Sequence, residues 1–127
     1  MTAAAILAVL LVGGIVVFQA ALALGAPWGS AAWGGRNAGV LPRNLRIASG
    51  IVAVVIYPIN IVLVLAAAGL IEADWLPADL TAVMWVLAAL LTVGALANFA
   101  SRSPRERFWG PVALTIAVCC AIIALNG

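Results

Sequence analysis

Seven polar side chains form the group best suited to bind a ligand. Four are amides or hydroxyls within or beside apolar segments, and three are arginines close to them: Gln19, Ser49, Asn98 and Thr115, with Arg46, Arg102 and Arg107. Guanidinium groups attract anions, whereas amides and hydroxyls orient a ligand through hydrogen bonds. The group therefore predicts a site for a neutral or anionic small molecule or for a lipid head group. A simpler explanation of the arginines is that they set membrane topology and pair with phospholipids.

A further polar position lies near the middle of an apolar segment. Pro58 has no N–H to donate to the carbonyl of Val54, so a helix here should be kinked, and Asn60 adds an amide within one turn. The freed carbonyl and the amide could bind a ligand. Alternatively, Asn60 forms a hydrogen bond to a neighbouring helix, a contact that contributes roughly 0.6–2 kcal/mol to packing. Tyr57 beside them is expected to pack rather than to react.

Side chains that commonly carry catalysis or bind cofactors are scarce. The chain has no histidine, which removes the commonest metal ligand and proton-transfer group. Cys119 and Cys120 are adjacent within an apolar segment and are expected to pack as small apolar residues. No carboxylate lies inside an apolar segment, so a proton-coupled carboxylate relay is not expected. The sequence predicts no cofactor, no metal site and no enzymatic activity. Glu106 is the one residue on which a lipid-modifying enzyme could depend.

The helices that carry these residues can be predicted from the composition and hydropathy of the chain. Of 127 residues, 67% are hydrophobic and 8% are charged, whereas soluble domains carry about a quarter charged residues. Four apolar stretches cover about residues 3–24, 47–71, 80–100 and 108–125. Each is close to the roughly 20 residues that a helix needs to cross a bilayer. The sequence predicts a single all-α membrane domain, an up-and-down bundle of four helices.

The charges predict the orientation of this bundle. All six basic residues are arginines in the loops 25–46 and 101–107, while the loop 72–79 carries only acidic residues. Because arginines near span ends remain in the cytoplasm, the first two loops should be cytoplasmic, and the acidic loop and both termini should be outside. This strong bias also argues against a transporter that inserts in both orientations. The net charge of +2 offers no surface for nucleic acid but suits anionic phospholipids.

The two arginine loops contain features that should hold them at the membrane surface. Trp28, Trp33 and Trp109 are expected to be interface anchors, with rings buried among head groups and indole N–H groups in water. Ser103 and Glu106 flank Pro104 with the spacing of a capping box, in which the two side chains cap each other's backbone N–H groups. A helix should therefore begin at Pro104.

Small residues occur on every apolar segment and should allow the helices to approach closely. Gly13 and Gly14 lie on the first segment, Gly94 lies on the third, and Ala66–Gly69 end the second. In lipid, such residues are typical of helix–helix interfaces.

The loop motifs also carry a resemblance. Its residues, taken together, are Gly25-Ala26-Pro27-Trp28-Gly29, Trp33-Gly34-Gly35, Leu41-Pro42, Arg46, Ser49, Asn98, Ser101, Ser103, Glu106-Arg107, Trp109 and Pro111. In these the chain resembles small bacterial four-span membrane proteins, of an actinobacterial type. The lysine-free, alanine- and arginine-rich composition is similar to that of proteins from high-GC bacteria. The resemblance implies a multi-pass protein of the bacterial inner membrane and implies no particular activity.

Three functions remain open from the sequence. The preferred prediction is a non-catalytic accessory or regulatory subunit that packs into a larger membrane assembly or self-associates. The second is a small transporter or binding protein for a neutral or anionic ligand that enters from the cytoplasmic face. The third is a lipid-modifying enzyme at the cytoplasmic interface.

Overall fold

Four helices are long and apolar enough to cross a membrane. The computed structural model describes residues 1–127, and these helices span Thr2–Ala23, Arg43–Ala67, Thr81–Phe99 and Pro104–Leu125. The structure contains no strand, so the predicted all-α fold is confirmed, and its four long helices are compatible with membrane spans. The second helix begins and ends about one turn earlier than expected.

The earlier end of the second helix has a local cause at Gly69. This residue has a φ of +74°, the Gly69 N–H donates to the Ala66 carbonyl, and the Leu70 N–H donates to the Leu65 carbonyl. This pattern is the Schellman motif, in which a left-handed glycine ends a helix. Gly25 ends the first helix in the same way, at a φ of +101°. Glycine position was thus a better boundary signal than hydropathy.

Two of the spans are built from several elements. The first span is α1 (Thr2–Ala23), and the third is α4 (Thr81–Phe99). The second consists of α2 (Arg43–Ile51), the π-helical segment η3 (Val52–Ile56) and α3 (Tyr57–Ala67). The fourth consists of the short α5 (Pro104–Arg107) and α6 (Trp109–Leu125). Between α1 and α2 the chain forms two 3₁₀ turns, η1 (Gly29–Ala31) and η2 (Trp33–Gly35).

The π-helical segment lies immediately before Pro58. The Tyr57 N–H donates to the Val52 carbonyl, five residues back, so the turn contains one more residue than an α-helical turn. A wider turn lets the chain continue past Pro58, which cannot donate to the Val54 carbonyl and whose ring would meet it. The expected irregularity at Pro58 therefore takes the form of a π-turn.

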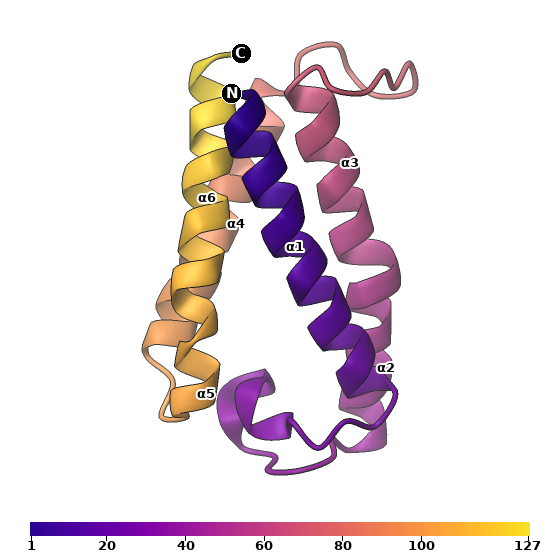
Figure 1. The fold of residues 1–127 in the computed structure, drawn as a ribbon, viewed down its shortest axis with the longest axis vertical. Coiled ribbons are helices and arrows are strands. Elements are labelled where there is room, and N and C mark those ends of the chain that lie inside the picture. The colour runs from indigo at the N-terminus through magenta and orange to yellow at the C-terminus, as the bar shows by residue number, and fades with distance from the viewer.

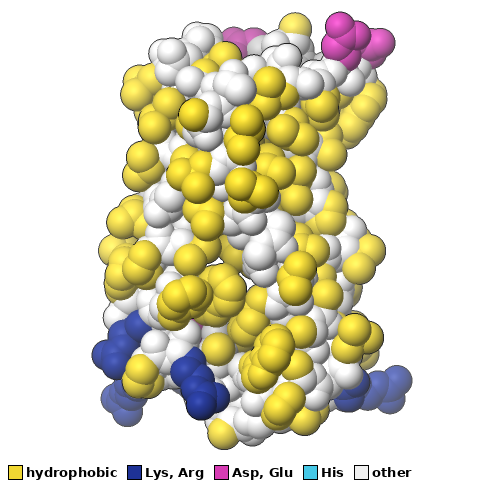
Figure 2. Space-filling model, viewed as in Figure 1, with side chains coloured by type: hydrophobic (Ala, Val, Ile, Leu, Met, Phe, Trp, Pro, Cys, Tyr) yellow, Lys and Arg dark blue, Asp and Glu magenta, His cyan; other side chains and the backbone are white.

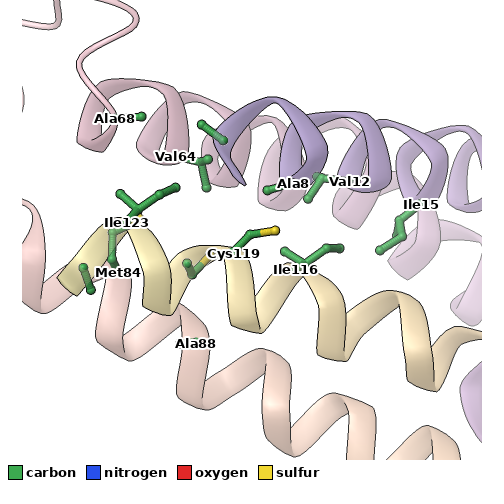
Figure 3. Close-up of a cluster of buried hydrophobic side chains, with 13 residues drawn as sticks. Ala8, Val12, Ile15, Val64, Ala68, Met84, Ala88, Ile116, Cys119 and Ile123 are labelled. Carbon is green, nitrogen blue, oxygen red and sulfur yellow. The ribbon is translucent and has the colours of Figure 1, made fainter. Parts of the chain in front are cut away.

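The helices meet closely at one end of the molecule. α4 and α6 pack along one another, and α1 starts beside α6 and runs diagonally to end beside α2 (Figure 1). Thirteen buried side chains form the core where α1, α3, α4 and α6 converge. Many are alanines, and Val12, Met84, Ile116 and Ile123 fill the space between them (Figure 3).

Charge divides the two ends of the bundle. Figure 2 shows arginines at one end, acidic side chains at the other and a broad apolar surface between them. We call these the arginine end (Arg36, Arg43, Arg46, Arg102, Arg105 and Arg107) and the acidic end (Glu72, Asp74 and Asp79). Both chain termini lie at the acidic end (Figure 1).

The glycines expected at helix contacts do not form them. A Cβ added at Gly13, Gly14 or Gly94 would have no heavy atom within 4 Å, so this expectation was wrong. Among the glycines within the four spans, Gly110 is the tightly packed one, since a Cβ there would lie 2.9 Å from the ring of Phe99. Helix contact at the acidic end depends on alanines, and the open glycines leave free space elsewhere.

Candidate functional site: a cavity at the arginine end

A cavity of about 420 Å³ lies on the arginine side of the core. Its walls come from α1, the second span, α4 and α6, and residues 31–33 of the first arginine loop close part of it. Most lining side chains are apolar, among them Ile15, Leu87 and Ala113. The size and lining are those of small-molecule sites in proteins, which are largely apolar with a few polar groups.

Five polar side chains from different elements line this cavity: Gln19, Tyr57, Asn60, Asn98 and Glu106. Two of them have buried oxygens without a hydrogen-bond partner, the Oε1 of Gln19 and the Oδ1 of Asn60. Asn60 is only 8% exposed. A buried oxygen without a donor costs roughly 1–3 kcal/mol, so native structures contain few of them. Two amide side chains without a hydrogen-bond partner on one cavity indicate a place where a ligand's polar groups would fit.

The π-turn and its surroundings contribute one wall of the cavity. Val52 and Ile56 line it from within η3, and Tyr57 and Asn60 line it from the first turn of α3. Single π-turns inside α-helices occur frequently at functional sites. Asn60 therefore faces the cavity and does not make the interhelical hydrogen bond that was one alternative for it.

Glu106 is the charged side chain that lines the cavity, and it is only 6% exposed. Its Oε2 accepts a 2.8 Å hydrogen bond from the Gly34 N–H. Gly34 has a φ of +84° and follows Trp33, which has a φ of +50°. The tight turn at Gly34 in the first arginine loop (residues 25–46) thus presents its backbone N–H to the Glu106 carboxylate of the second arginine loop (residues 101–107).

Ser103 strengthens this connection between the two loops. Its hydroxyl donates to the Ser30 carbonyl, and the Arg105 guanidinium lies 3.4 Å from the Ser30 hydroxyl. A Cβ on Gly35 would lie 2.5 Å from the Cβ of Ser103, so the loops touch where only glycine fits. We call the contacts of Ser30, Gly34 and Gly35 with Ser103 and Glu106 the loop latch.

The capping-box prediction was therefore wrong in its hydrogen bonds. Ser103 is the N-cap residue of α5 and Pro104 is its first residue, as expected. However, neither Ser103 nor Glu106 caps the other, because both side chains bind the first arginine loop. The Ser103 N–H donates to the Ser101 hydroxyl instead, at 3.1 Å. Ser103 and Glu106 have the spacing of a capping box, but their side chains form hydrogen bonds with Ser30 and Gly34 of the first arginine loop instead.

Ser49 and Trp33 hold the first arginine loop from the other side. The Trp33 Nε1–H donates to the Ser49 Oγ at 2.8 Å, and Ser49 is fully buried. The expectation that the Trp33 N–H contacts water was thus wrong. Ser49 itself does not line the cavity. It accepts a hydrogen bond from Trp33, which does.

Aromatic rings form much of the remaining cavity wall: Phe18, Trp33, Tyr57 and Trp109. The centroids of the Phe18 and Trp109 rings are 4.6 Å apart, and Trp28 stacks on Phe18 at 6.3 Å with nearly parallel planes. Trp28 is 47% exposed, which suits the expected role at the membrane surface. Trp33 and Trp109 face the cavity in addition to any such role.

The remaining predicted binding residues do not line the cavity. The Thr115 hydroxyl donates to the Pro111 carbonyl of its own helix, and the Arg46 Nε–H donates to the Ala23 carbonyl at the end of α1. Arg102 lines a separate surface hollow with Arg36, and Arg107 is exposed. Of the seven candidates, the structure brings Gln19 and Asn98 together.

Sequence reasoning missed the cavity roles of Tyr57, Trp33, Trp109 and Glu106. Glu106 was weighed only as a cap or as a catalytic base. The signal that could have found it is the Trp33-Gly34-Gly35 turn, whose flexible backbone can present an N–H to a carboxylate. Cys119 and Cys120 are free thiols buried in the core, where they pack as expected.

No family model, no curated protein and no solved structure matches this chain.

Proposed function

We propose that the protein binds a small amphipathic molecule within the membrane and exchanges it at the arginine end. The observation that carries this proposal is a pair of amide side chains, Gln19 and Asn60, that line one cavity and form no hydrogen bond within the protein. A purely structural bundle would gain by replacing both amides with leucine, because each leaves a buried polar atom unpaired. A ligand with hydrogen-bond donors removes that cost.

The setting we propose is the bacterial inner membrane, with an up-and-down bundle and both termini outside. The arginine distribution supports this topology, since it places loops 25–46 and 101–107 in the cytoplasm and loop 72–79 outside. Exposed arginines and Trp28 at the arginine end would pair with anionic phospholipid head groups. The cavity would then lie in the cytoplasmic half of the bilayer.

The chemistry of the cavity suits binding better than catalysis. Amides, a phenol and aromatic rings orient a ligand through hydrogen bonds and stacking. The Glu106 carboxylate already accepts the Gly34 N–H, which gives it a structural role as well. The accessory-subunit function and the lipid-modifying enzyme stay predictions from the sequence.

The test uses the tryptophans of the cavity wall as reporters. Trp28→Phe, Trp75→Phe and Trp85→Phe would leave Trp33 and Trp109, both of which line the cavity. Bromophenethyl alcohol, an aryl bromide, quenches indole fluorescence on contact. We expect saturable quenching of this variant in nonionic detergent.

Two glycine substitutions separate binding in the cavity from contact through the micelle. Gly94 lines the cavity and has room for a side chain, so Gly94→Leu should occupy part of the space and reduce the saturable quenching. Gly14 has equal room but lies outside the cavity, so Gly14→Leu should leave the quenching unchanged. Equal quenching in wild type and in Gly94→Leu would refute a ligand-binding cavity.

A further inference from the structure

The charge at the cavity is negative, although the end of the molecule around it is positive. Glu106 lines the cavity, and no guanidinium group does. The hydrogen bond that Glu106 Oε2 receives comes from a neutral backbone amide. The neighbouring Arg105 and Arg107 are exposed, so they remain in water. A bound anion would meet this carboxylate, whereas a cation would offset its charge.

The uncharged polar groups accommodate the same kind of ligand. The amides of Gln19 and Asn60 form no hydrogen bond within the protein, and each has an oxygen acceptor. An ammonium group carries several N–H donors and no acceptor. It could therefore donate to the Glu106 carboxylate or to an amide oxygen.

The aromatic wall adds a second, independent preference for a cation. Phe18, Trp33, Tyr57 and Trp109 line the cavity together with Glu106. The faces of aromatic rings attract cations, most strongly those of tryptophan, and the interaction is stronger where water is excluded. Apolar side chains occupy the rest of the wall, which suits a hydrocarbon portion.

From the carboxylate and the aromatic wall we propose that the cavity takes an organic ammonium ion that carries an apolar group. This assignment rests on the proposed binding function and narrows it. It replaces the neutral or anionic ligand expected from the sequence, because the arginines that suggested an anion lie outside the cavity. Two sources share this chemistry: a free amphipathic amine and the ammonium head group of a membrane lipid such as phosphatidylethanolamine.

Three matched probes test the charge preference in the variant that retains Trp33 and Trp109. They are bromophenethylammonium, bromophenethyl alcohol and bromophenylpropionate, which share the aryl bromide and differ in the charge of the other end. We expect the ammonium probe to reach half-maximal quenching at a concentration at least tenfold below that of the alcohol. The carboxylate probe should bind most weakly. Equal affinity for ammonium and alcohol, or a preference for the carboxylate, would overturn the assignment.

Two variants locate the origin of the preference. Glu106→Gln keeps an acceptor for the Gly34 N–H but removes the charge, so it should abolish most of the ammonium probe's advantage and leave alcohol binding intact. Retained alcohol binding also shows that the variant is folded. Asn60→Leu, which leaves the loop latch untouched, should weaken ammonium binding severalfold. An unchanged ammonium advantage in both variants would contradict the proposal.

The same measurements distinguish failure of this inference from failure of the proposed function. If no probe gives quenching that Gly94→Leu reduces, the binding function itself is wrong. If Gly94→Leu reduces quenching by all probes but the ammonium probe has no advantage, only the ligand class is wrong.

Reconstitution in lipid vesicles identifies the source of the ammonium group. The protein is reconstituted in phosphatidylglycerol vesicles with or without phosphatidylethanolamine. Reduced affinity for the ammonium probe when phosphatidylethanolamine is present would indicate a lipid head group as the occupant. Unchanged affinity would indicate a free amine.

Discussion

The helices pack closely at the acidic end of the bundle and are separated at the arginine end. At the acidic end, small side chains such as Ala5, Ala8 and Ala124 let the helices converge, and Met84 and Ile123 fill the remaining space without being exposed. At the arginine end the helices separate, and loops and aromatic rings occupy part of the gap. The acidic end thus contributes most of the packing, whereas the arginine end leaves the cavity and its unpaired polar groups.

In this protein the buried polar side chains lie at the end of the bundle where the helices pack least closely. The main core contains no charged side chain, whereas the cavity has amides, a phenol and a carboxylate. The loop latch and the Trp33–Ser49 hydrogen bond hold the arginine end together in place of helix contact. The two ends should consequently respond differently to substitution.

The largest expected effect comes from opening the core at the acidic end. Ile123→Ala removes a side chain that is 1% exposed and should lower the free energy of unfolding by about 2–4 kcal/mol. Reversible unfolding in mixed detergent micelles measures this change. Leu10→Ala is the control, because Leu10 is 68% exposed and its loss should have little effect. Similar losses for both variants would mean that Ile123 does not belong to a tightly packed core.

The next effect concerns the arginine end alone. Glu106→Ala removes the acceptor of the Gly34 N–H and should cost about 1.5–3 kcal/mol, as expected for a hydrogen bond to a charged group. Hydrogen exchange should accelerate at Gly34 and remain unchanged in α4 around Met84. Glu106→Gln, which keeps an oxygen acceptor, should cause a smaller change. Acceleration spread evenly over both ends would show that the latch is not a local feature.

A smaller loss is expected at the contact between Trp33 and Ser49. Ser49→Ala leaves the Trp33 Nε1–H without its partner and should destabilise the protein by about 1 kcal/mol. The fluorescence of Trp33 should also shift, since its indole loses a fixed partner. Thr115→Ala is a matched hydroxyl deletion on α6, where the hydroxyl bonds only its own helix, and it should cost less. The reverse order would contradict a structural role for Ser49.

The smallest effect lies at the acidic end and depends on pH. Asp79 accepts a 2.9 Å hydrogen bond from the Thr81 N–H, and the Thr81 backbone and side-chain hydrogen bonds hold the pKa of its carboxyl below the ordinary value of 3.8. A lowered pKa means that the carboxylate's contribution is present above that value and is lost as the pH falls through the folded pKa. NMR of the Thr81 amide should therefore show α4 loosening at its start only in acid. Asp79→Asn should remove this pH dependence, and loosening near neutral pH would contradict the explanation.

The four spans could be predicted because length and hydropathy alone decide whether a helix can cross a membrane. Cavity residues were predictable only in part. Gln19, Ser49, Asn98 and Thr115 lie in the same half of the bundle, yet only Gln19 and Asn98 line the cavity. Depth follows from position along a helix, but the direction of a side chain depends on how each helix is rotated against its neighbours, and the four apolar spans give no such information.

The loop latch could not be predicted for a different reason. Ser103 and Glu106 have suitable local partners, and sequence spacing always favours those. Their actual partners lie more than 70 residues away in the chain. Only the folded path of residues 25–42 brings these groups together, and that path depends on turns such as the one at Trp33.

The unpaired oxygens of Gln19 and Asn60 have a consequence for how the protein would behave when heated. A molecule that binds the folded state alone raises the free energy of unfolding, by about 2.7 kcal/mol at a hundredfold excess over its dissociation constant. Gln19 and Asn60 form no hydrogen bond within the protein, so a ligand that pairs with their amides would satisfy these polar groups as well as add contacts. The melting temperature of the unlabelled protein can therefore rank amines by affinity, without any reporter group.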